Sequence, residues 1–178
     1  MIHRDLKPGN VLLDGDTPKI TDFGYARTNL SLVMTSKVGT VNYMAPEVIL
    51  GNNYSFSADV FSYGMMLWEL YSGDFPFSWV PRARVTDEII DDTPLPYKMP
   101  IAKELKKLIE DCKCIDPEKR PSFSDIIERM LDEQIAYNGT NPAEVKEFYE
   151  KKAEKRAEML QNQPQNTQNL CMSTILTF

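Results

Sequence analysis

The chain has 178 residues, of which 42% are hydrophobic and 26% are charged, so it is long enough to bury the core of one ordinary globular domain. Its 26 acidic and 20 basic side chains give a net charge of −6, which argues against nucleic acid as a partner because phosphate backbones are bound by clustered Lys and Arg. No apolar run approaches the roughly 20 residues of a membrane span, and no apolar signal region follows Met1, so neither membrane insertion nor secretion is expected.

The N-terminal quarter predicts a β-hairpin followed by a loop. Residues 10–13 (NVLL) and 18–21 (PKIT) are short strand patterns on either side of the turn residues Asp14, Gly15 and Asp16. The segment that follows, up to about residue 44, is rich in Thr, Ser and Asn without a clear period. Such a composition is typical of a long functional loop.

The middle of the chain predicts a buried helix. From Ser57 the sequence SADVFSYGMMLWELYSG is apolar over most of a helical circumference, which indicates a helix at the centre of a domain. Ser57 is the expected N-cap, and Gly73 is the expected end of the helix. The proline-rich residues 74–100 are expected to be irregular, with a short helix at VTDEII.

Three further helices are predicted towards the C-terminus. The first, IAKELKKLIEDCKC, is amphipathic, and the second, SFSDIIERMLDEQIAY, is capped by Ser122 or Ser124. The third covers residues 142–160 and is charged, with only a thin apolar stripe. A surface helix lying on the domain is the favoured interpretation of this stripe, and a partner-binding helix is the alternative. One face of the first helix is formed by Leu105, Leu108, Ile109 and Cys112.

The three cysteines are sparse and odd in number. Cys112, Cys114 and Cys171 form no CxxC pair, which makes both a disulfide framework and a zinc site poor explanations. We therefore expect free thiols in a reducing compartment, and a cytoplasmic protein.

Four polar residues near the N-terminus suit phosphoryl transfer. Asp5 is a candidate acceptor for a hydroxyl proton, and Lys7 lies on the same side of an extended loop, where it can meet a phosphate. Asn10 and Asp22 offer oxygen atoms that suit a hard cation such as Mg²⁺, and a hairpin places them at one end. The alternative is that Asp5, Asn10 and Asp22 are loop residues that only cap turns.

Three motifs in order resemble the signature of protein kinases. HRDLKPGN at residues 3–10 resembles the catalytic loop, DFG at 22–24 the magnesium-binding motif, and APE at 45–47 the end of the activation segment. Downstream, SADVFSYGMMLWEL and DPEKRPSF resemble the central helix and a late segment of the large lobe. Small-molecule phosphotransferases share a similar catalytic loop but no APE segment, which sets them aside.

The resemblance implies a mainly α fold, the large (C-terminal) lobe of a protein kinase, helical with a short β-hairpin at the catalytic loop. It covers residues 1–137, a partial kinase domain, followed by a charged helical extension at 138–160 and a low-complexity, disordered tail at 161–178. The chain contains no Gly-rich phosphate loop, no strand lysine in a VAIK context and no helix glutamate to pair with it. The small lobe is therefore expected to be absent.

The resemblance also assigns roles around ATP and Mg²⁺. It implies that Asp5 is the catalytic base, that Lys7 stabilises the γ-phosphate, and that Asn10 and Asp22 hold the two Mg²⁺ ions. Leu12 lies where the family places an apolar residue under the adenine.

Further residues resemble the family's regulatory positions. Arg4 precedes the base, as in kinases that phosphorylation of the activation loop switches on, because an added phosphate can pair with it. Thr40 matches the threonine that touches the catalytic base and lysine in Ser/Thr kinases. Candidate phosphorylation sites are Thr28, Ser31, Thr35 and Ser36.

Other residues match structural positions of the family. His3 and Phe23 correspond to the lower half of the stacked apolar column of active kinases. Asp59 is expected to hydrogen-bond the backbone of the catalytic loop. Glu47 of APE is expected to pair with Arg120.

The resemblance implies a substrate class. The lysine in DLKPGN and the GT before APE resemble Ser/Thr kinases, and the wording of GTVNYMAPEV is most similar to the tyrosine-kinase-like branch. The favoured hypothesis is a kinase that transfers the ATP γ-phosphate to Ser or Thr of protein substrates, represented by an incomplete sequence.

Two alternatives remain open. One is an inactive kinase-like module that binds proteins through a surface near residues 80–100 and competes with full kinases. The other is a chain whose site is completed by a separately encoded small lobe. For the chain as given we expect little or no activity, because one wall of the site is missing.

Overall fold

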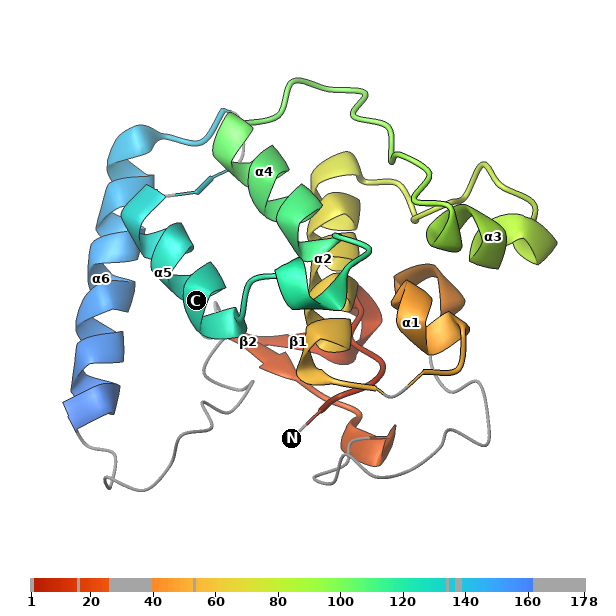
Figure 1. Ribbon diagram of the computed structural model, residues 1–178. Coiled ribbons are helices and arrows are strands. Elements are labelled where there is room, and N and C mark those ends of the chain that lie inside the picture. Colours follow the sequence, from red (N-terminus) through yellow and green to blue (C-terminus); the bar gives the residue numbers. More distant parts are fainter. Residues whose placement is uncertain are drawn as a thin grey trace.

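The computed structural model describes residues 2–15, 17–25, 40–52, 54–133, 135–136 and 139–161. Within these ranges the protein is mainly helical with one two-stranded antiparallel sheet, which confirms the predicted fold class (Figure 1). The elements are β1 (Val11–Asp14), β2 (Thr17–Ile20), α1 (Pro46–Ile49), α2 (Phe56–Ser72), α3 (Val85–Ile90), α4 (Lys103–Cys112), α5 (Phe123–Glu133) and α6 (Pro142–Gln161).

The β-hairpin is formed where the sequence predicts it. Val11 pairs with Ile20, and Asp14 pairs with Thr17. Gly15 turns the chain with a φ of 58°, a conformation that glycine adopts without steric cost. The pairing extends past the strands, since the Thr21 N–H donates to the Asn10 carbonyl at 2.8 Å. The residue before β1 and the residue after Thr21 therefore lie at the same end of the hairpin.

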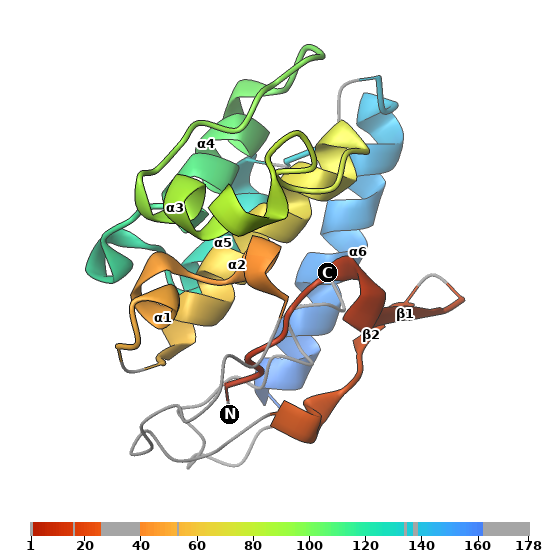
Figure 2. The same ribbon diagram turned by 90° about the vertical axis from the view of Figure 1, so that its right-hand side faces the viewer.

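Helix α2 runs through the centre of the molecule, and other helices pack around it (Figures 1 and 2). It ends at Gly73, as predicted, with a φ of 69°. The predicted N-cap is wrong by two residues: the helix begins at Phe56, and Ser55 is the N-cap. Ser55 has extended backbone, whereas Ser57 already lies in the first helical turn, so only Ser55 can occupy the capping position.

Helices α2 and α4 cross closely because of one glycine. The predicted face of α4 is fully buried against the core. A Cβ atom placed on Gly64 of α2 would lie 2.7 Å from Cβ of Cys112 on α4, so only glycine permits this approach. Cys112 is a buried free thiol and Cys114 a partly exposed one, while Cys171 lies outside the described residues.

The C-terminal helices carry the predicted local signals. Ser122 caps α5 in a reciprocal arrangement with Asp125: the Asp125 N–H donates to Ser122 Oγ at 3.2 Å, and the Ser122 N–H donates to Asp125 Oδ2 at 2.8 Å. Pro142 opens α6, and Lys151 pairs with Glu147 at 2.7 Å. Among the described residues, no helix is both long and apolar enough to cross a membrane.

Helix α6 lies alongside α5 (Figure 1). The buried Tyr149 donates its hydroxyl hydrogen bond to the carbonyl of Ile135, and Arg156 lies 3.6 Å from Glu128 of α5. Phe148, the neighbouring aromatic residue, remains 46% exposed. These contacts favour the interpretation of a helix that lies on the domain.

Replacing Tyr149 by phenylalanine should loosen α6. The change leaves the buried Ile135 carbonyl without its donor, which we expect to cost about 1 kcal/mol and to speed hydrogen exchange of α6 amides about fivefold. A matched control is Tyr97→Phe, because Tyr97 bonds Glu110 at an exposed position where water replaces the lost partner. Equal exchange of α6 in the wild type and Tyr149→Phe would contradict the assignment.

Candidate active site

The segment before the hairpin is fixed to α2 by a buried carboxylate. The backbone N–H groups of His3 and Arg4 donate to Asp59 Oδ2 and Oδ1 at 2.8 and 2.9 Å. Asp59 has no exposed surface, and this burial raises its pKa to about 6 although the two hydrogen bonds oppose the shift. Asp59 therefore fixes the backbone of the catalytic loop at His3 and Arg4 from the interior of the molecule, and this is the contact that the sequence predicts.

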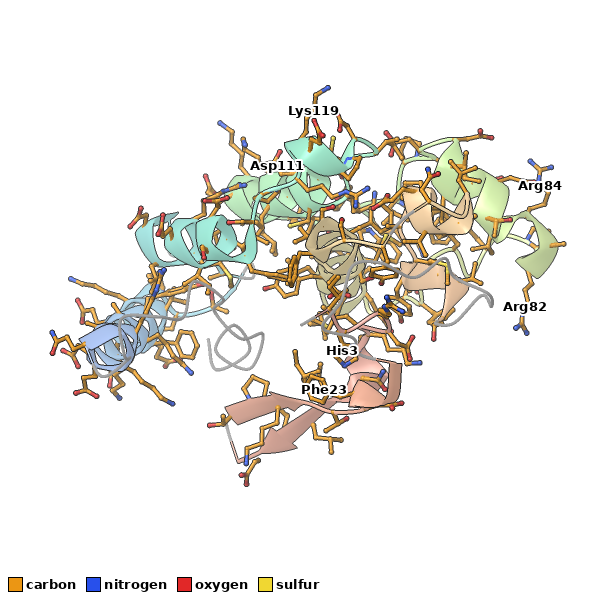
Figure 3. The ribbon with its side chains drawn as sticks, turned by 60° about the horizontal axis from the view of Figure 1, so that its bottom comes forward. His3, Phe23, Arg82, Arg84, Asp111 and Lys119 are labelled. Carbon is orange, nitrogen blue, oxygen red and sulfur yellow. The ribbon has the colours of Figure 1, made fainter. Side chains whose placement is uncertain are left out.

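His3 joins this loop to the segment that follows β2. Its Nε2 lies 2.9 Å from the Thr21 carbonyl, and its Nδ1 accepts the Asp5 N–H at 3.3 Å. A neutral ring with hydrogen on Nε2 satisfies both contacts. The His3 ring meets Phe23 edge to face, with centroids 5.1 Å apart (Figure 3). The predicted stacked pair is thus in contact.

Three residues converge on Asp5, which is only 7% exposed. Lys7 Nζ lies 2.7 Å from Asp5 Oδ2 and donates to Thr40 Oγ1 at 2.8 Å. Asn10 Nδ2 donates to the Asp5 carbonyl at 2.7 Å and to Asp5 Oδ2 at 3.1 Å. The Thr40 N–H donates to Asp5 Oδ1 at 3.0 Å. Thr40 therefore contacts both Asp5 and Lys7, as expected.

This cluster keeps Asp5 ionised. Burial alone would raise the pKa of Asp5, but the hydrogen bonds and charge of Lys7, with the Thr40 N–H and Asn10, outweigh it and hold the pKa below its ordinary value. The result is a fixed carboxylate next to a cation and beside a hydroxyl group. Such a carboxylate can orient and accept a proton from an attacking hydroxyl.

Asn10 and Asp22 have the chemistry of a magnesium site. The amide nitrogen of Asn10 is held by Asp5, which leaves its Oδ1 for a ligand. Asp22 is exposed and forms no hydrogen bond or ion pair with another residue that the structure describes. Its φ is 60°, a strained value for a residue other than glycine. Two such oxygens, completed by phosphates and water, suit Mg²⁺.

Both faces of strand β1 are open. Leu12, the residue expected under an adenine, is 57% exposed, and Leu13, on the opposite face of the strand, is 74% exposed. The side chain of Leu12 is an exposed apolar surface that a flat ring can cover.

The guanidinium group of Arg4 is only partly paired by the residues that the structure describes. Its guanidinium lies 5.5 Å from the ring centre of Tyr54, and its buried Nε has no hydrogen-bond partner among the described residues. The expected phosphorylation sites Thr28, Ser31, Thr35 and Ser36 all lie outside the described residues.

Glu47 and Arg120 form the expected ion pair, and it is bidentate. Arg120 Nη1 and Nη2 lie 2.7 and 2.8 Å from the two carboxylate oxygens. The remaining donors of Arg120 bond the carbonyls of Cys114, Ser57 and Ile115. The guanidinium is fully buried and fully hydrogen-bonded, so the pair anchors α1 to the segment before α5.

Two features of the site were not predicted from the sequence. Tyr54 lies over Arg4, and its hydroxyl is 3.5 Å from Asp59, but no motif marks it. The groove that runs from residues 40–42 to residues 75–86 overlaps the expected docking surface near residues 80–100, but its side at residues 40–42 was not expected. Its two sides are distant in the sequence, so no local pattern could reveal it.

Comparison with known proteins agrees with this geometry. Residues 1–131 match the protein kinase domain family. The chain is 42% identical over 139 residues to Serine/threonine-protein kinase STY17 of Arabidopsis thaliana, covering 76% of this chain and 24% of that protein. It is 37% identical over 147 residues to Mitogen-activated protein kinase kinase kinase 11 of Rattus norvegicus, covering 76% and 17%.

A third relative shows the same partial overlap. Mitogen-activated protein kinase kinase kinase 7 of Bos taurus is 40% identical over 134 residues, which cover 73% of this chain and 23% of that protein. The chain thus spans a quarter or less of the length of these relatives. With its family match and its catalytic-loop geometry, the chain belongs to the eukaryotic protein kinase family, where it resembles the tyrosine-kinase-like branch.

Proposed function

We propose that this chain carries the phosphoryl-transfer residues of a Ser/Thr protein kinase, which moves the γ-phosphate of ATP to Ser or Thr hydroxyls of proteins. The observation that carries the proposal is the cluster of Lys7, Asn10 and Thr40 around the buried, ionised carboxylate of Asp5. Phosphoryl transfer needs little covalent chemistry from the protein, so positioning and charge account for most of the catalysis.

Each residue has a separate role in this proposal. Asp5 orients the accepting hydroxyl and takes its proton. Lys7 neutralises charge on the γ-phosphate, and Asn10 and Asp22 hold Mg²⁺ through their oxygens. Bound Mg²⁺ supplies charge neutralisation between the phosphates. Leu12 packs under the adenine.

The regulatory and structural roles complete the proposal. Arg4 would pair with a phosphate added to Thr28, Ser31, Thr35 or Ser36, and Thr40 would hold Asp5 and Lys7 in register. The catalytic loop keeps its conformation through contacts of His3, Phe23 and Asp59. The ion pair between Glu47 and Arg120 holds α1 in place on the side of the site where the substrate binds.

A second candidate is an inactive kinase-like module that binds proteins. The exposure of Leu12 and Leu13 favours it, because ATP held only by its phosphates and Mg²⁺ in open solvent binds weakly and reacts slowly.

Titration of the purified chain with ATP, with and without Mg²⁺, tests the proposal. We expect binding that requires Mg²⁺ and is lost in Asp22→Ala. Asp14→Ala is the matched control, because Asp14 lies on the same hairpin and only pairs with Lys19 at the surface. An affinity for ATP that is the same with and without Mg²⁺, and the same in the wild type and Asp22→Ala, would contradict the proposed metal site.

Phosphotransfer to a protein substrate then separates the two candidates. Transfer that disappears in Asp5→Asn supports the kinase. Binding without any transfer favours the module.

A further inference from the structure

The groove between residues 40–42 and 75–86 begins beside Asp5. It encloses about 560 Å³, within the roughly 300–1,000 Å³ of typical ligand sites. Thr40 lines its near end, and the Thr40 N–H donates to Asp5. A polypeptide lying in the groove therefore lies next to Thr40, the residue whose backbone N–H holds the carboxylate of Asp5.

The two walls of the groove are held together by specific contacts. Asn42 Nδ2 donates to the carbonyl of Pro76 at 2.7 Å. The rings of Tyr43 and Phe75 meet edge to face, with centroids 5.9 Å apart. The groove is thus formed before a ligand arrives, which lowers the entropy lost on binding.

The lining mixes apolar and polar side chains, and its polar members are Thr40, Asn42, Ser78, Arg82 and Thr86. Phe75, which is 46% exposed, supplies aromatic surface, while Phe77 is only 3% exposed and has a φ of 57°, a strained conformation of the kind that is retained at binding sites. Among the described lining residues there is no carboxylate, and Arg82 is the single charged side chain. The residues that line the groove therefore carry a net positive charge, in a chain whose net charge is −6.

Arg82 and Arg84 belong to the same short 3-10 helix, Arg82–Arg84, but differ in their partners. Arg84 is neutralised, since its Nε lies 3.1 Å from Asp87 and its Nη2 lies 3.7 Å from Glu88. Arg82 is exposed and forms no ion pair within the described part of the chain. The two side chains leave the helix in opposite directions (Figure 3). Arg82 is therefore the cation available to a ligand in the groove.

We propose that this groove selects acidic protein substrates, with Arg82 as the specificity-determining residue. An apolar side chain next to the accepting Ser or Thr packs on Phe75 and the partly buried Val80, and an Asp or Glu a few residues away meets the guanidinium of Arg82. The inference rests on the proposed function only for the identity of the accepting hydroxyl, because selective binding of the peptide requires no phosphotransfer.

Peptide binding in the absence of ATP tests this proposal. The probes are peptides with a Ser-Leu core that carry Asp, Asn or Lys at positions on either side of it. Trp79 reports binding by its fluorescence, because it is 45% exposed and its ring centre lies 5.8 Å from that of Phe77. We expect the best Asp peptide to bind about fivefold more tightly than its Asn counterpart, less so at high salt.

Three variants separate the effect of Arg82 from that of positive charge in general. Arg82→Gln should abolish the preference for Asp, Arg82→Glu should transfer it to the Lys peptide, and Arg84→Gln should leave it unchanged. Equal affinity of the wild type for Asp and Asn peptides would overturn the proposal, as would an equal loss in Arg82→Gln and Arg84→Gln. Selective binding without phosphotransfer would leave the groove assignment intact and remove only the proposed activity.

Discussion

Replacing Arg120 by alanine is expected to lower the free energy of unfolding by roughly 3–5 kcal/mol. The change removes both hydrogen bonds to Glu47 and leaves its carboxylate, which is 12% exposed, without a partner. It also frees three backbone carbonyls that the guanidinium now bonds. Because domains of this size are stable by only about 5–15 kcal/mol, such a loss is a large part of the total.

Urea denaturation of the purified chain measures this effect. Lys119→Ala is the matched control, because Lys119 is adjacent in sequence and 74% exposed (Figure 3). Its ion pair with Asp116, at 3.4 Å, lies at the surface. The cost of Lys119→Ala should stay below about 0.5 kcal/mol. Arg120→Lys should fall between the two, since lysine keeps the charge but not the bidentate geometry. Similar costs for Arg120→Ala and Lys119→Ala would refute the anchoring role.

The second large effect is a dependence of stability on pH that comes from Asp59. Burial raises the pKa of this carboxyl from 3.8 to about 6 in the folded chain. The folded state therefore binds the proton more tightly than the unfolded state, and the Asp59 contribution to stability increases as pH falls through this window. Above pH 6 the folded chain keeps Asp59 as a buried charge. This charge lowers the free energy of unfolding by about 3 kcal/mol relative to a chain in which Asp59 is neutral.

Asp59→Asn removes this titration. We subtract the free energy of unfolding of Asp59→Asn from that of the wild type. This difference should increase by up to about 3 kcal/mol as pH falls from 7 to 4, because only the wild type gains a proton on folding. Equilibrium unfolding at several pH values measures the difference.

Asp111→Asn is the control for this titration (Figure 3). Burial opposes ionisation of Asp111, but Lys107 and Arg129, each 2.8 Å away, outweigh it and lower the pKa of that carboxyl. Its contribution should be constant above pH 3.8 and decline only below it. If the difference in free energy of unfolding between the wild type and Asp59→Asn does not change with pH, burial does not raise the pKa of Asp59.

Local patterns were enough for most of the secondary structure. The hairpin follows from two short strand patterns around the turn residues Asp14, Gly15 and Asp16, and the buried face of α4 follows from helical spacing, because both depend on neighbours a few residues apart. The N-cap of α2 shows the limit of such signals. Ser55 and Ser57 are equally good caps by type, and the backbone conformation at Ser55 decided between them.

The sequence by itself determined that this chain is mainly helical, that it belongs among the protein kinases, and that Asp5, Lys7 and Asn10 lie in one loop. These properties reside in short motifs whose members are close along the chain. Only the tertiary structure decided that Tyr54 covers Arg4, and that residues 40–42 face residues 75–86 across a groove. Arg82 lines this groove without an ion pair to any residue that the structure describes. Contacts of this kind depend on how distant segments pack against α2, and no pattern of neighbouring residues encodes that packing.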